Sequence, residues 1–419
     1  MKSELSEIMK DAGLDAIVVM GASGSNPPMK YFVGDAFFTS AMVIIPANDE
    51  PVLIYPPMER DNAAKTGMKR INIDEFPLKK LLDEMDGDLS QAEALQISKI
   101  LTAVGVPAGK ISICGMNEFG NVFNKVVSLN KIAPEYEVLP KKAISCLNKA
   151  RISKDKKELA EIRRMGKVVV SIVADVENYI RSCHLVDERL ISPSGNPVTI
   201  GEIKRMINHE LLDAGAENPE GTIFAMGKDA AVPHNSGNNA EVLLAGKTIV
   251  FDFFPRDAGS GYFYDFTRTW CIGHASRKLQ EAYNQVKEIH DEIIALAKPG
   301  IPMKELQSIT CDRFKALGHK TIKDNPGTFE GYVHTIGHGL GLDVHERPSS
   351  GFSAPDDDTV EINRVFTVEP GLYYPEGDEP FGIRIEDTVY IDEHGKAQIM
   401  AEYPYELVIP VQKSAEEKK

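Results

Sequence analysis

The sequence has few cysteines, few aromatic residues and no long apolar run. Its five cysteines are odd in number and scattered, and no Cys-x-x-Cys pair occurs, which disfavours a disulfide framework or a zinc ribbon. No segment approaches the roughly 20 apolar residues of a membrane-spanning helix, and acidic residues run through the amphipathic N-terminus, unlike a signal peptide. We therefore expect a cytoplasmic protein with reduced cysteines that does not bind membranes.

Positive charge is also in deficit. The 47 lysines and arginines are outnumbered by 62 acidic residues, which gives a formal net charge of −15. Nucleic acids and anionic membranes both favour basic patches, so neither is an expected partner. With 419 residues, the chain is long enough to form two domains, each with its own core.

The first part of the chain alternates strand-like and helix-like segments. Apolar, β-branched runs predict strands at residues 16–20, 41–47, 51–55 and 110–115. A turn signal at residues 47–50 predicts a hairpin between the second and third of these strands, and residues 91–105 have helical spacing. We predict an α/β domain over residues 1–148, without evident catalytic chemistry.

A basic stretch at residues 149–156 predicts a linker, in which Ser153 is a candidate N-cap for the helix that follows. One face of that long amphipathic helix carries apolar residues at positions 159, 162, 165, 169, 172, 173, 176 and 180. We expect a second domain over residues 157–412, followed by a polar tail at 413–419.

Two hairpins in the second domain place acids in apolar strands. In residues 247–270 the turn signal "RDAGSG" separates two β-rich runs, and a turn centred between Ala258 and Gly259 would set Asp252 opposite Asp265. Directly opposed residues have Cβ atoms about 4.5–5.5 Å apart. Two carboxylates at that spacing repel each other unless they are protonated or neutralised by a cation.

The second hairpin, residues 364–392, repeats this arrangement around "PEGDEP". A symmetric pairing sets Glu369 opposite Glu386, and Arg384 projects from the same face as Glu386 because side chains alternate along a strand. We interpret two other acids of this region, Asp387 and Asp392, as solvent-facing.

Together with a histidine, these four carboxylates form a hard, oxygen-rich set of ligands. Such a set suits Mn²⁺, Co²⁺, Fe²⁺ or Zn²⁺, with two ions about 3.5–4 Å apart sharing bridging carboxylates. Candidate histidines are His338 and His345 in "TIGHGLGLDVHE", residues 335–346, where three glycines indicate a bend or a close approach of another segment.

The motifs "DFTRTW", "GHGLGLDVHE", "FTVEPGLY" and "GIRIED" surround these residues. With them the chain resembles the creatinase/methionine-aminopeptidase (pita-bread) superfamily, peptidase family M24, and within it the Xaa-Pro peptidases aminopeptidase P and prolidase. The resemblance covers the whole chain. It implies an α+β fold, in which a pita-bread catalytic domain, an antiparallel sheet with helices, follows a smaller creatinase-like α/β domain. The separation of the first two acids is longer than in many members, which we interpret as a longer loop.

The resemblance also implies the metal ligands. Asp252 is similar to the chelating aspartate of one metal, and His338 to the imidazole ligand of the other. Asp265 and Glu386 resemble the two bridging carboxylates. Glu369 resembles the glutamate that both binds metal and shuttles the proton of the bridging water.

Four further residues resemble those on the substrate side of the family's site. His345 is similar to the histidine near the scissile carbonyl, and His234 in "AVPHNSGN" to an upstream substrate-side histidine. Arg384 resembles the arginine that supports the last ligand strand. His334 occupies a position where aminopeptidase P and prolidase often carry a histidine.

The implied function is hydrolysis of the Xaa-Pro peptide bond by metal-bound hydroxide, with two divalent ions, Mn²⁺ before Co²⁺, Zn²⁺ or Fe²⁺, in a cytoplasmic homodimer. Peptides with proline in the second position are the expected substrates. The residues leave open whether the enzyme is an aminopeptidase or a dipeptidase. The alternatives are a superfamily member that acts on a small non-peptide metabolite, or a pita-bread binding module without catalysis.

Overall fold

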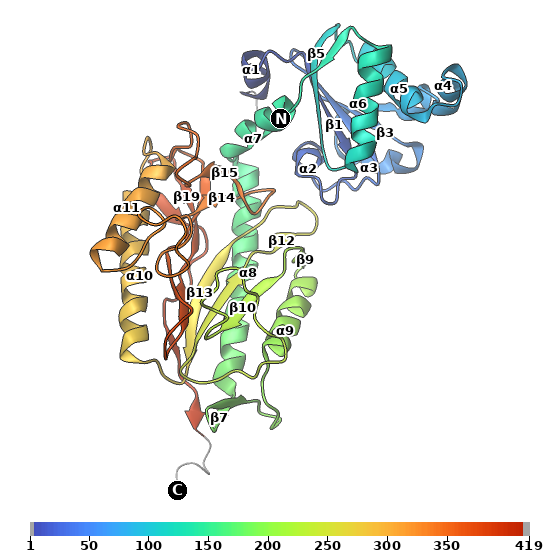
Figure 1. Cartoon of the computed structure of the whole chain (residues 1–419). Coiled ribbons are helices and arrows are strands. Elements are labelled where there is room, and N and C mark those ends of the chain that lie inside the picture. Colours follow the sequence, from blue (N-terminus) through green and yellow to red (C-terminus); the bar gives the residue numbers. More distant parts are fainter. Residues whose placement is uncertain (1–3, 414–419) are drawn as a thin grey trace. The chain divides into compact units, whose positions relative to one another are not determined.

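The computed structural model describes residues 4–413 and divides into two compact units (Figure 1). The N-terminal unit extends to residue 151 and includes residues 259–261, and the C-terminal unit contains the remainder. The predicted linker is helical as far as Ile152. Of the predicted tail, Lys413 ends a short strand, and residues 414–419 lie outside the described residues. Within residues 4–413, no helix combines the length and apolar character needed to cross a bilayer.

The N-terminal unit is built on a six-stranded mixed sheet of order β4-β3-β2-β1-β5-β6. Its strands are β1 (Ala16–Gly21), β2 (Ala41–Pro46), β3 (Val52–Tyr55), β4 (Lys69–Asn72), β5 (Gly109–Cys114) and β6 (Tyr136–Val138). Its helices are α1 (Glu4–Asp11), α2 (Pro27–Val33), α3 (Arg60–Lys65), α4 (Leu78–Glu84), α5 (Leu89–Ala103), α6 (Phe119–Ile132) and α7 (Lys142–Ile152), with 3₁₀ turns η1 (Pro57–Glu59) and η2 (Ile73–Glu75). The predicted hairpin is β2–β3, with Val43 opposite Leu53.

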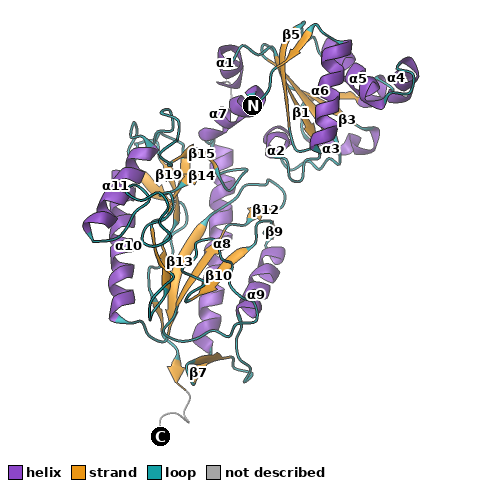
Figure 2. Ribbon diagram, in the orientation of Figure 1, coloured by secondary structure: helices purple, strands orange, loops and turns teal. Residues whose placement is uncertain are grey.

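Helices lie on both sides of this sheet (Figure 2), and side-chain alternation along the strands divides the unit into two cores. On β1, Ile17 and Val19 pack with residues of α1, α2 and α7 on one face of the sheet. The alternate residues, Ala16 and Val18, pack with residues of α5 and α6 on the other face. Because both faces are covered, the central strands are apolar throughout, as is usual for an α/β layer arrangement.

The C-terminal unit contains a four-stranded sheet, β10-β11-β13-β21, and a five-stranded sheet, β15-β14-β16-β19-β20. Its strands are β7 (His184–Val186), β8 (Arg189–Ile191), β9 (Ala216–Glu217), β10 (Thr222–Met226), β11 (Thr248–Phe253), β12 (Arg256–Asp257), β13 (Phe266–Ile272), β14 (His338–Gly339), β15 (Glu346–Ser349), β16 (Val365–Val368), β17 (Gly371–Tyr374), β18 (Phe381–Arg384), β19 (Asp387–Ile391), β20 (Ala397–Ile399), β21 (Val408–Ile409) and β22 (Gln412–Lys413). Its helices are α8 (Lys156–Ser182), α9 (Ile200–Asp213), α10 (Arg277–Leu296) and α11 (Met303–Ala316).

Two pairs of helices cover these sheets. Residues of α8 and α9 share a core with the four-stranded sheet, and residues of α10 and α11 share a second core with the five-stranded sheet. The predicted apolar face of α8 is buried from Ile162 to Ile180, whereas Leu159 is half-buried. The helix is capped by Asp155 and not by Ser153, because Asp155 and Glu158 form a reciprocal capping box.

Candidate metal centre

The first acidic hairpin, β11–β13, has a different register from the predicted one. Asp252 lies opposite Thr267, two residues away from its predicted partner Asp265. The turn is symmetric, but it is centred between Gly259 and Ser260, one residue later than predicted, as the pairing of Arg256 with Phe263 shows. A shift of two residues keeps every side chain on its face. Both acids therefore still face the same side.

The second acidic hairpin has the predicted register, although it is not one continuous ladder. Val368 lies opposite Asp387 in β16–β19, and Gly371 lies opposite Arg384 in β17–β18. Glu369 and Glu386 occupy the break between these two ladders. The Glu386 N–H instead donates to the Thr267 carbonyl at 3.0 Å, so the backbone joins the second hairpin to the first at the acidic cluster.

The five predicted ligands converge at this junction. Potential ligand atoms of Asp265, His338 and Glu386 all lie within 4.8 Å of one another. His338 Nε2 is 3.6 Å from Asp265 Oδ2 and 3.4 Å from Glu369 Oε1. The charge of Asp252 raises the pKa of Glu369 and of both other acids, which places it in the same electrostatic cluster.

Burial and mutual repulsion dominate the electrostatics of the cluster. Burial, followed by the charges of neighbouring acids, raises the pKa of Asp265 and of Glu386 well above their ordinary values. Burial also raises the pKa of Glu369 to about 8, against the opposing effect of Arg384. Burial and the neighbouring His345 lower the pKa of His338 to about 3, so this imidazole is neutral and available as a ligand.

Three carboxylate oxygens in the cluster have no hydrogen-bond donor within residues 4–413. They are Asp252 Oδ1, Asp265 Oδ1 and Glu386 Oε1, and all three are buried. Buried polar atoms are almost always satisfied, so three buried carboxylate oxygens without donors in one acidic cluster fit the binding of a cation. Carboxylates with a single imidazole match the preference of divalent Mn, Co, Fe and Zn, so the residues fit the metal centre that was predicted.

The glycine-rich segment 335–346 brings its two histidines together. The rings of His338 and His345 have centroids 4.2 Å apart. A side chain on Gly337 would collide with the Thr367 carbonyl, and one on Gly339 with the Arg347 carbonyl. The glycines are therefore required by close approach of neighbouring backbone, one of the two alternatives that the sequence left open.

Comparison with known proteins agrees with this geometry. The family described as Metallopeptidase family M24 matches residues 160–393, a stretch that contains all five predicted ligands. This chain belongs to metallopeptidase family M24.

Relatives within the M24 family extend over both units. The Xaa-Pro dipeptidase of Pyrococcus horikoshii is 26% identical over 404 residues, which cover 94% of this chain and 95% of the relative. The structure of a Xaa-Pro dipeptidase from Bacillus anthracis has a TM-score of 0.72 at 22% identity, over 97% of this chain and 98% of that one. An X-Pro aminopeptidase from Thermotoga maritima has a TM-score of 0.70 at 22% identity, with the same coverage. These likenesses confirm the predicted α+β pita-bread fold.

A buried arginine organises one side of the M24 site. Arg384 forms an ion pair with Asp252 Oδ2 and donates from Nη1 to the Tyr373 hydroxyl at 2.6 Å. That hydroxyl lies 3.0 Å from His334 Nε2, and His334 Nδ1 lies 2.8 Å from the Thr335 carbonyl. Since the arginine can only donate, Tyr373 donates to Nε2, and the neutral His334 carries its proton on Nδ1. Tyr373 was missed by sequence reasoning because a strand tyrosine has no distinguishing pattern.

The two remaining histidines lie on the exposed side of the site. His345 and His234 are both solvent-exposed. Burial and the charge of His234 lower the pKa of His345, and the same charge contributes, after burial and Arg384, to the lowered pKa of His334. Both histidines are thus placed where an incoming substrate could meet them, and His345 also lies against His338 of the acidic cluster.

One acid was wrongly predicted to face solvent. Asp387 is completely buried, whereas Asp392 is half-exposed. Asp387 forms an ion pair with Arg268 at 2.9 Å, lies 3.1 Å from His290 Nε2, and accepts a 2.6 Å hydrogen bond from Tyr405. The strand containing Asp387 is covered on this face by α10, and the basic and hydroxyl partners replace the water that the carboxylate would otherwise need.

Proposed function

We propose that this M24 peptidase hydrolyses the Xaa-Pro peptide bond, as an aminopeptidase P or a prolidase. The single observation that carries the proposal is the cluster of five ligands with three orphaned carboxylate oxygens. The names of the relatives, Xaa-Pro dipeptidase and X-Pro aminopeptidase, supply the substrate class. We further propose two divalent ions, Mn²⁺ before Co²⁺, Zn²⁺ or Fe²⁺, held by Asp252, Asp265, His338, Glu369 and Glu386.

We also propose that residues 1–148 and 157–412 form the accessory and catalytic domains of a cytoplasmic homodimer. The division of the contacts near residue 151 supports two domains. The relatives match over both units, which supports the view that the first domain is a regular part of this type of enzyme.

Divalent ions at this site would polarise the substrate carbonyl and lower the pKa of a water molecule. The residues of the chain then have separate tasks. Glu369 lies 3.4 Å from His338 Nε2 within the cluster, where its carboxylate can take the proton of the attacking water and pass it to the proline nitrogen as the bond breaks. Thr367 Oγ1, 3.3 Å from Glu369 Oε1, orients that carboxyl group.

Histidines on the exposed side can contact the substrate. The neutral His345 can donate a hydrogen bond to the carbonyl oxygen as negative charge develops on it, which is the type of stabilisation that contributes most to acyl-transfer catalysis. His234 lies on the same exposed side and is proposed to bind the substrate. Arg384 orients Asp252 through their buried ion pair.

The test is turnover by protein stripped of metal and reloaded with Mn²⁺, Co²⁺ or Zn²⁺. Gly-Pro and a longer Gly-Pro-Ala peptide are compared, with Gly-Leu as the control that lacks proline. Hydrolysis of Gly-Pro alone identifies a dipeptidase, and hydrolysis of the longer peptide an aminopeptidase. If neither proline peptide is cleaved with any of the three metals, the proposed function is wrong.

A further inference from the structure

The segment that carries two histidines of the site is held by side chains more than by a sheet. In this segment, residues 334–338 (the ligand loop), only His338 belongs to a strand. The Gly337 N–H donates to the Ser350 hydroxyl at 3.2 Å, and the His338 N–H to the Thr367 hydroxyl at 3.1 Å. Both hydroxyl-bearing residues are buried. The position of the ligand loop therefore depends on a few buried polar groups.

A buried glutamine binds the ligand loop at two different residues. Gln307 lies on α11 and has no exposed surface. Its Oε1 accepts hydrogen bonds from the Ile336 N–H at 2.6 Å and from the Tyr332 hydroxyl at 2.9 Å. Its Nε2 donates to the His334 carbonyl at 3.2 Å. The two ends of one side-chain amide thus fix both a donor and an acceptor of the loop backbone.

Ile336 also connects this support to the acidic cluster. While the Ile336 N–H is held by Gln307, the Ile336 carbonyl accepts the N–H of Glu369 at 2.9 Å. A displacement of Ile336 would therefore move Glu369 as well as His334. Glu369 in turn lies 3.4 Å from His338 Nε2, so three residues of the site share this support.

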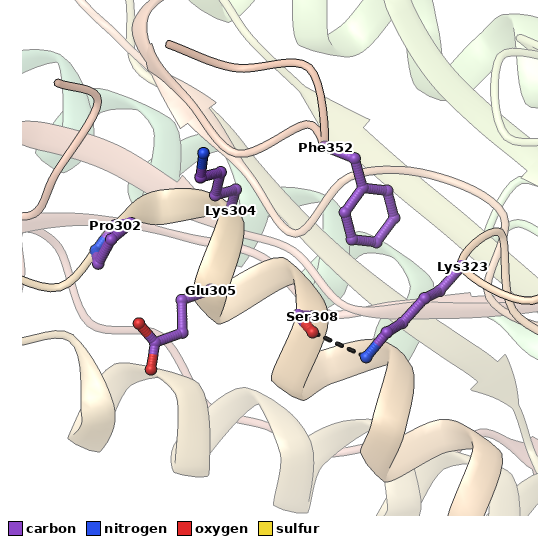
Figure 3. A pocket seen from close by; sticks show the side chains of 6 residues that line it. All are labelled: Pro302, Lys304, Glu305, Ser308, Lys323 and Phe352. Atoms are coloured by element: carbon purple, nitrogen blue, oxygen red, sulfur yellow. Dashed lines mark hydrogen bonds between the residues drawn. The ribbon is translucent and has the colours of Figure 1, made fainter. Parts of the chain in front are cut away.

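Neighbouring residues of α11 show that the placement of Gln307 is specific. Lys304, Glu305 and Ser308 line an open hollow on the outer face of the helix, closed on its other side by Phe352 (Figure 3). Lys323 spans this hollow and donates to Ser308 at 2.8 Å. A glutamine on that outer face would cost nothing in desolvation, whereas a buried amide is tolerated only when it is hydrogen-bonded.

We propose that Gln307 is a positioning residue, which sets the geometry of His334 and Glu369 through the ligand loop. The expected effect of Gln307 on metal binding does not depend on which substrate the enzyme cleaves. Its expected effect on turnover rests on the proposed function. Outer partners of metal ligands are each worth about 10- to 100-fold in affinity or activity. Misplacement of a catalytic group by about 1 Å costs on the order of 100-fold in rate.

The test compares three variants with the wild type. Gln307→Met keeps the approximate length of the side chain and removes its hydrogen bonds. Gln307→Glu restores the oxygen that accepts from Ile336 and Tyr332. Thr310→Val is the matched control, since Thr310 is equally buried on the same helix but its hydroxyl donates to the Leu306 carbonyl within that helix.

Mn²⁺ dissociation constants are measured by calorimetry, and kcat and KM on the Xaa-Pro substrate are measured at saturating Mn²⁺. For Gln307→Met we expect Mn²⁺ binding about 10-fold weaker and kcat lower by about 10- to 100-fold with KM nearly unchanged. Gln307→Glu should recover part of both losses, and Thr310→Val should match the wild type. If Gln307→Met does not fold, the comparison of Gln307→Glu with Thr310→Val carries the test, and Gln307→Glu should then bind Mn²⁺ more weakly and have a lower kcat than Thr310→Val.

Equal Mn²⁺ affinity and equal kcat in the foldable Gln307 variant and in Thr310→Val would overturn the positioning role. A wild type that cleaves no proline peptide, together with weakened Mn²⁺ binding in the Gln307 variant, would refute the proposed function and support the positioning role. A wild type that binds none of Mn²⁺, Co²⁺ and Zn²⁺ and cleaves neither proline peptide would refute both.

Discussion

Glu386 and Asp387 are consecutive acids that are both buried, yet their surroundings are opposite. Glu386 faces Asp265, Glu369 and Asp252, whose charges add to burial in raising its pKa. Asp387 faces Arg268, His290 and Tyr405. Burial opposes its ionisation, but Arg268 and His290 outweigh burial, and its pKa lies below the ordinary value.

The difference shows that burial alone does not identify a metal ligand. Side chains of consecutive strand residues point to opposite faces, so a single strand supplies one acid to the metal centre and the next to the core. What separates the two is the charge balance of their partners. A carboxylate surrounded by other carboxylates is stabilised by a bound cation, whereas the charge of a carboxylate paired with arginine is already neutralised.

The largest effect is expected for Glu386→Gln. Since even outer partners of metal ligands are worth 10- to 100-fold, loss of a ligand should lower turnover by at least about 1,000-fold. Mn²⁺ binding, measured by calorimetry, should weaken as well. The melting temperature of the metal-free protein should not fall, because one of several mutually repelling acids is removed. Retention of wild-type turnover would remove Glu386 from the ligand set.

Asp387→Asn should act on stability instead. The buried Arg268 guanidinium would then face a neutral amide in place of a carboxylate, so its charge would no longer be balanced. Breaking a buried ion pair in this way lowers the free energy of unfolding by about 3 kcal/mol or more. Urea unfolding of the metal-free protein measures this loss. Turnover per folded molecule should remain within a few-fold of the wild type. The opposite result, abolished turnover with unchanged stability, would make Asp387 part of the metal centre.

The contribution of Asp387 also has a defined pH dependence. Its pKa is lowered from 3.8 on folding, so its stabilisation is present above pH 3.8 and is lost as the pH falls through the lower folded value. The stability difference between wild type and Asp387→Asn should therefore narrow below pH 3.8.

The smallest effect is expected for Thr267→Val. The Thr267 hydroxyl donates to Glu386 Oε2 at 2.7 Å, and its loss leaves that carboxylate less well oriented. Mn²⁺ affinity should fall about 10-fold, or about 1.4 kcal/mol. The control is Thr269→Val on the same strand, whose hydroxyl donates to the Arg384 carbonyl and not to a ligand carboxylate. Equal affinities in the two variants would show that the Thr267 hydrogen bond has no part in metal binding.

Local patterns predicted the second hairpin better than the first. The strands around "PEGDEP" turn symmetrically, so the pairing of Glu369 with Glu386 could be counted from the sequence, and the register has the predicted positions. In the first hairpin, the pairs Asp252–Thr267 and Arg256–Phe263 centre the turn between Gly259 and Ser260, one residue later than predicted. The sequence "RDAGSG" is compatible with either centre, and no local rule chooses between them. A shift of two residues keeps the side-chain parity, so the predicted ligands Asp252 and Asp265 still lie on one face.

The role of Gln307 and the burial of Asp387 could not be predicted from the sequence. Gln307 lies in an ordinary helical pattern, and its burial depends on the loop that packs against it. Asp387 is one residue from a ligand and was assigned to solvent, since the arginine and histidine that neutralise it come from β13 and α10. Long-range pairing of polar groups is set by tertiary packing, which periodicity does not encode.

The junction of Thr267 with Glu386 also has a consequence for biosynthesis. It joins residues separated by 119 positions, and the ligand set itself extends from Asp252 to Glu386. Such distant contacts form late, because the closure of a long loop precedes any gain from the contact. A chain that emerges from the ribosome would thus have no complete metal centre until Glu386 has left the exit tunnel, and capture of the proposed ions would mark the end of domain assembly.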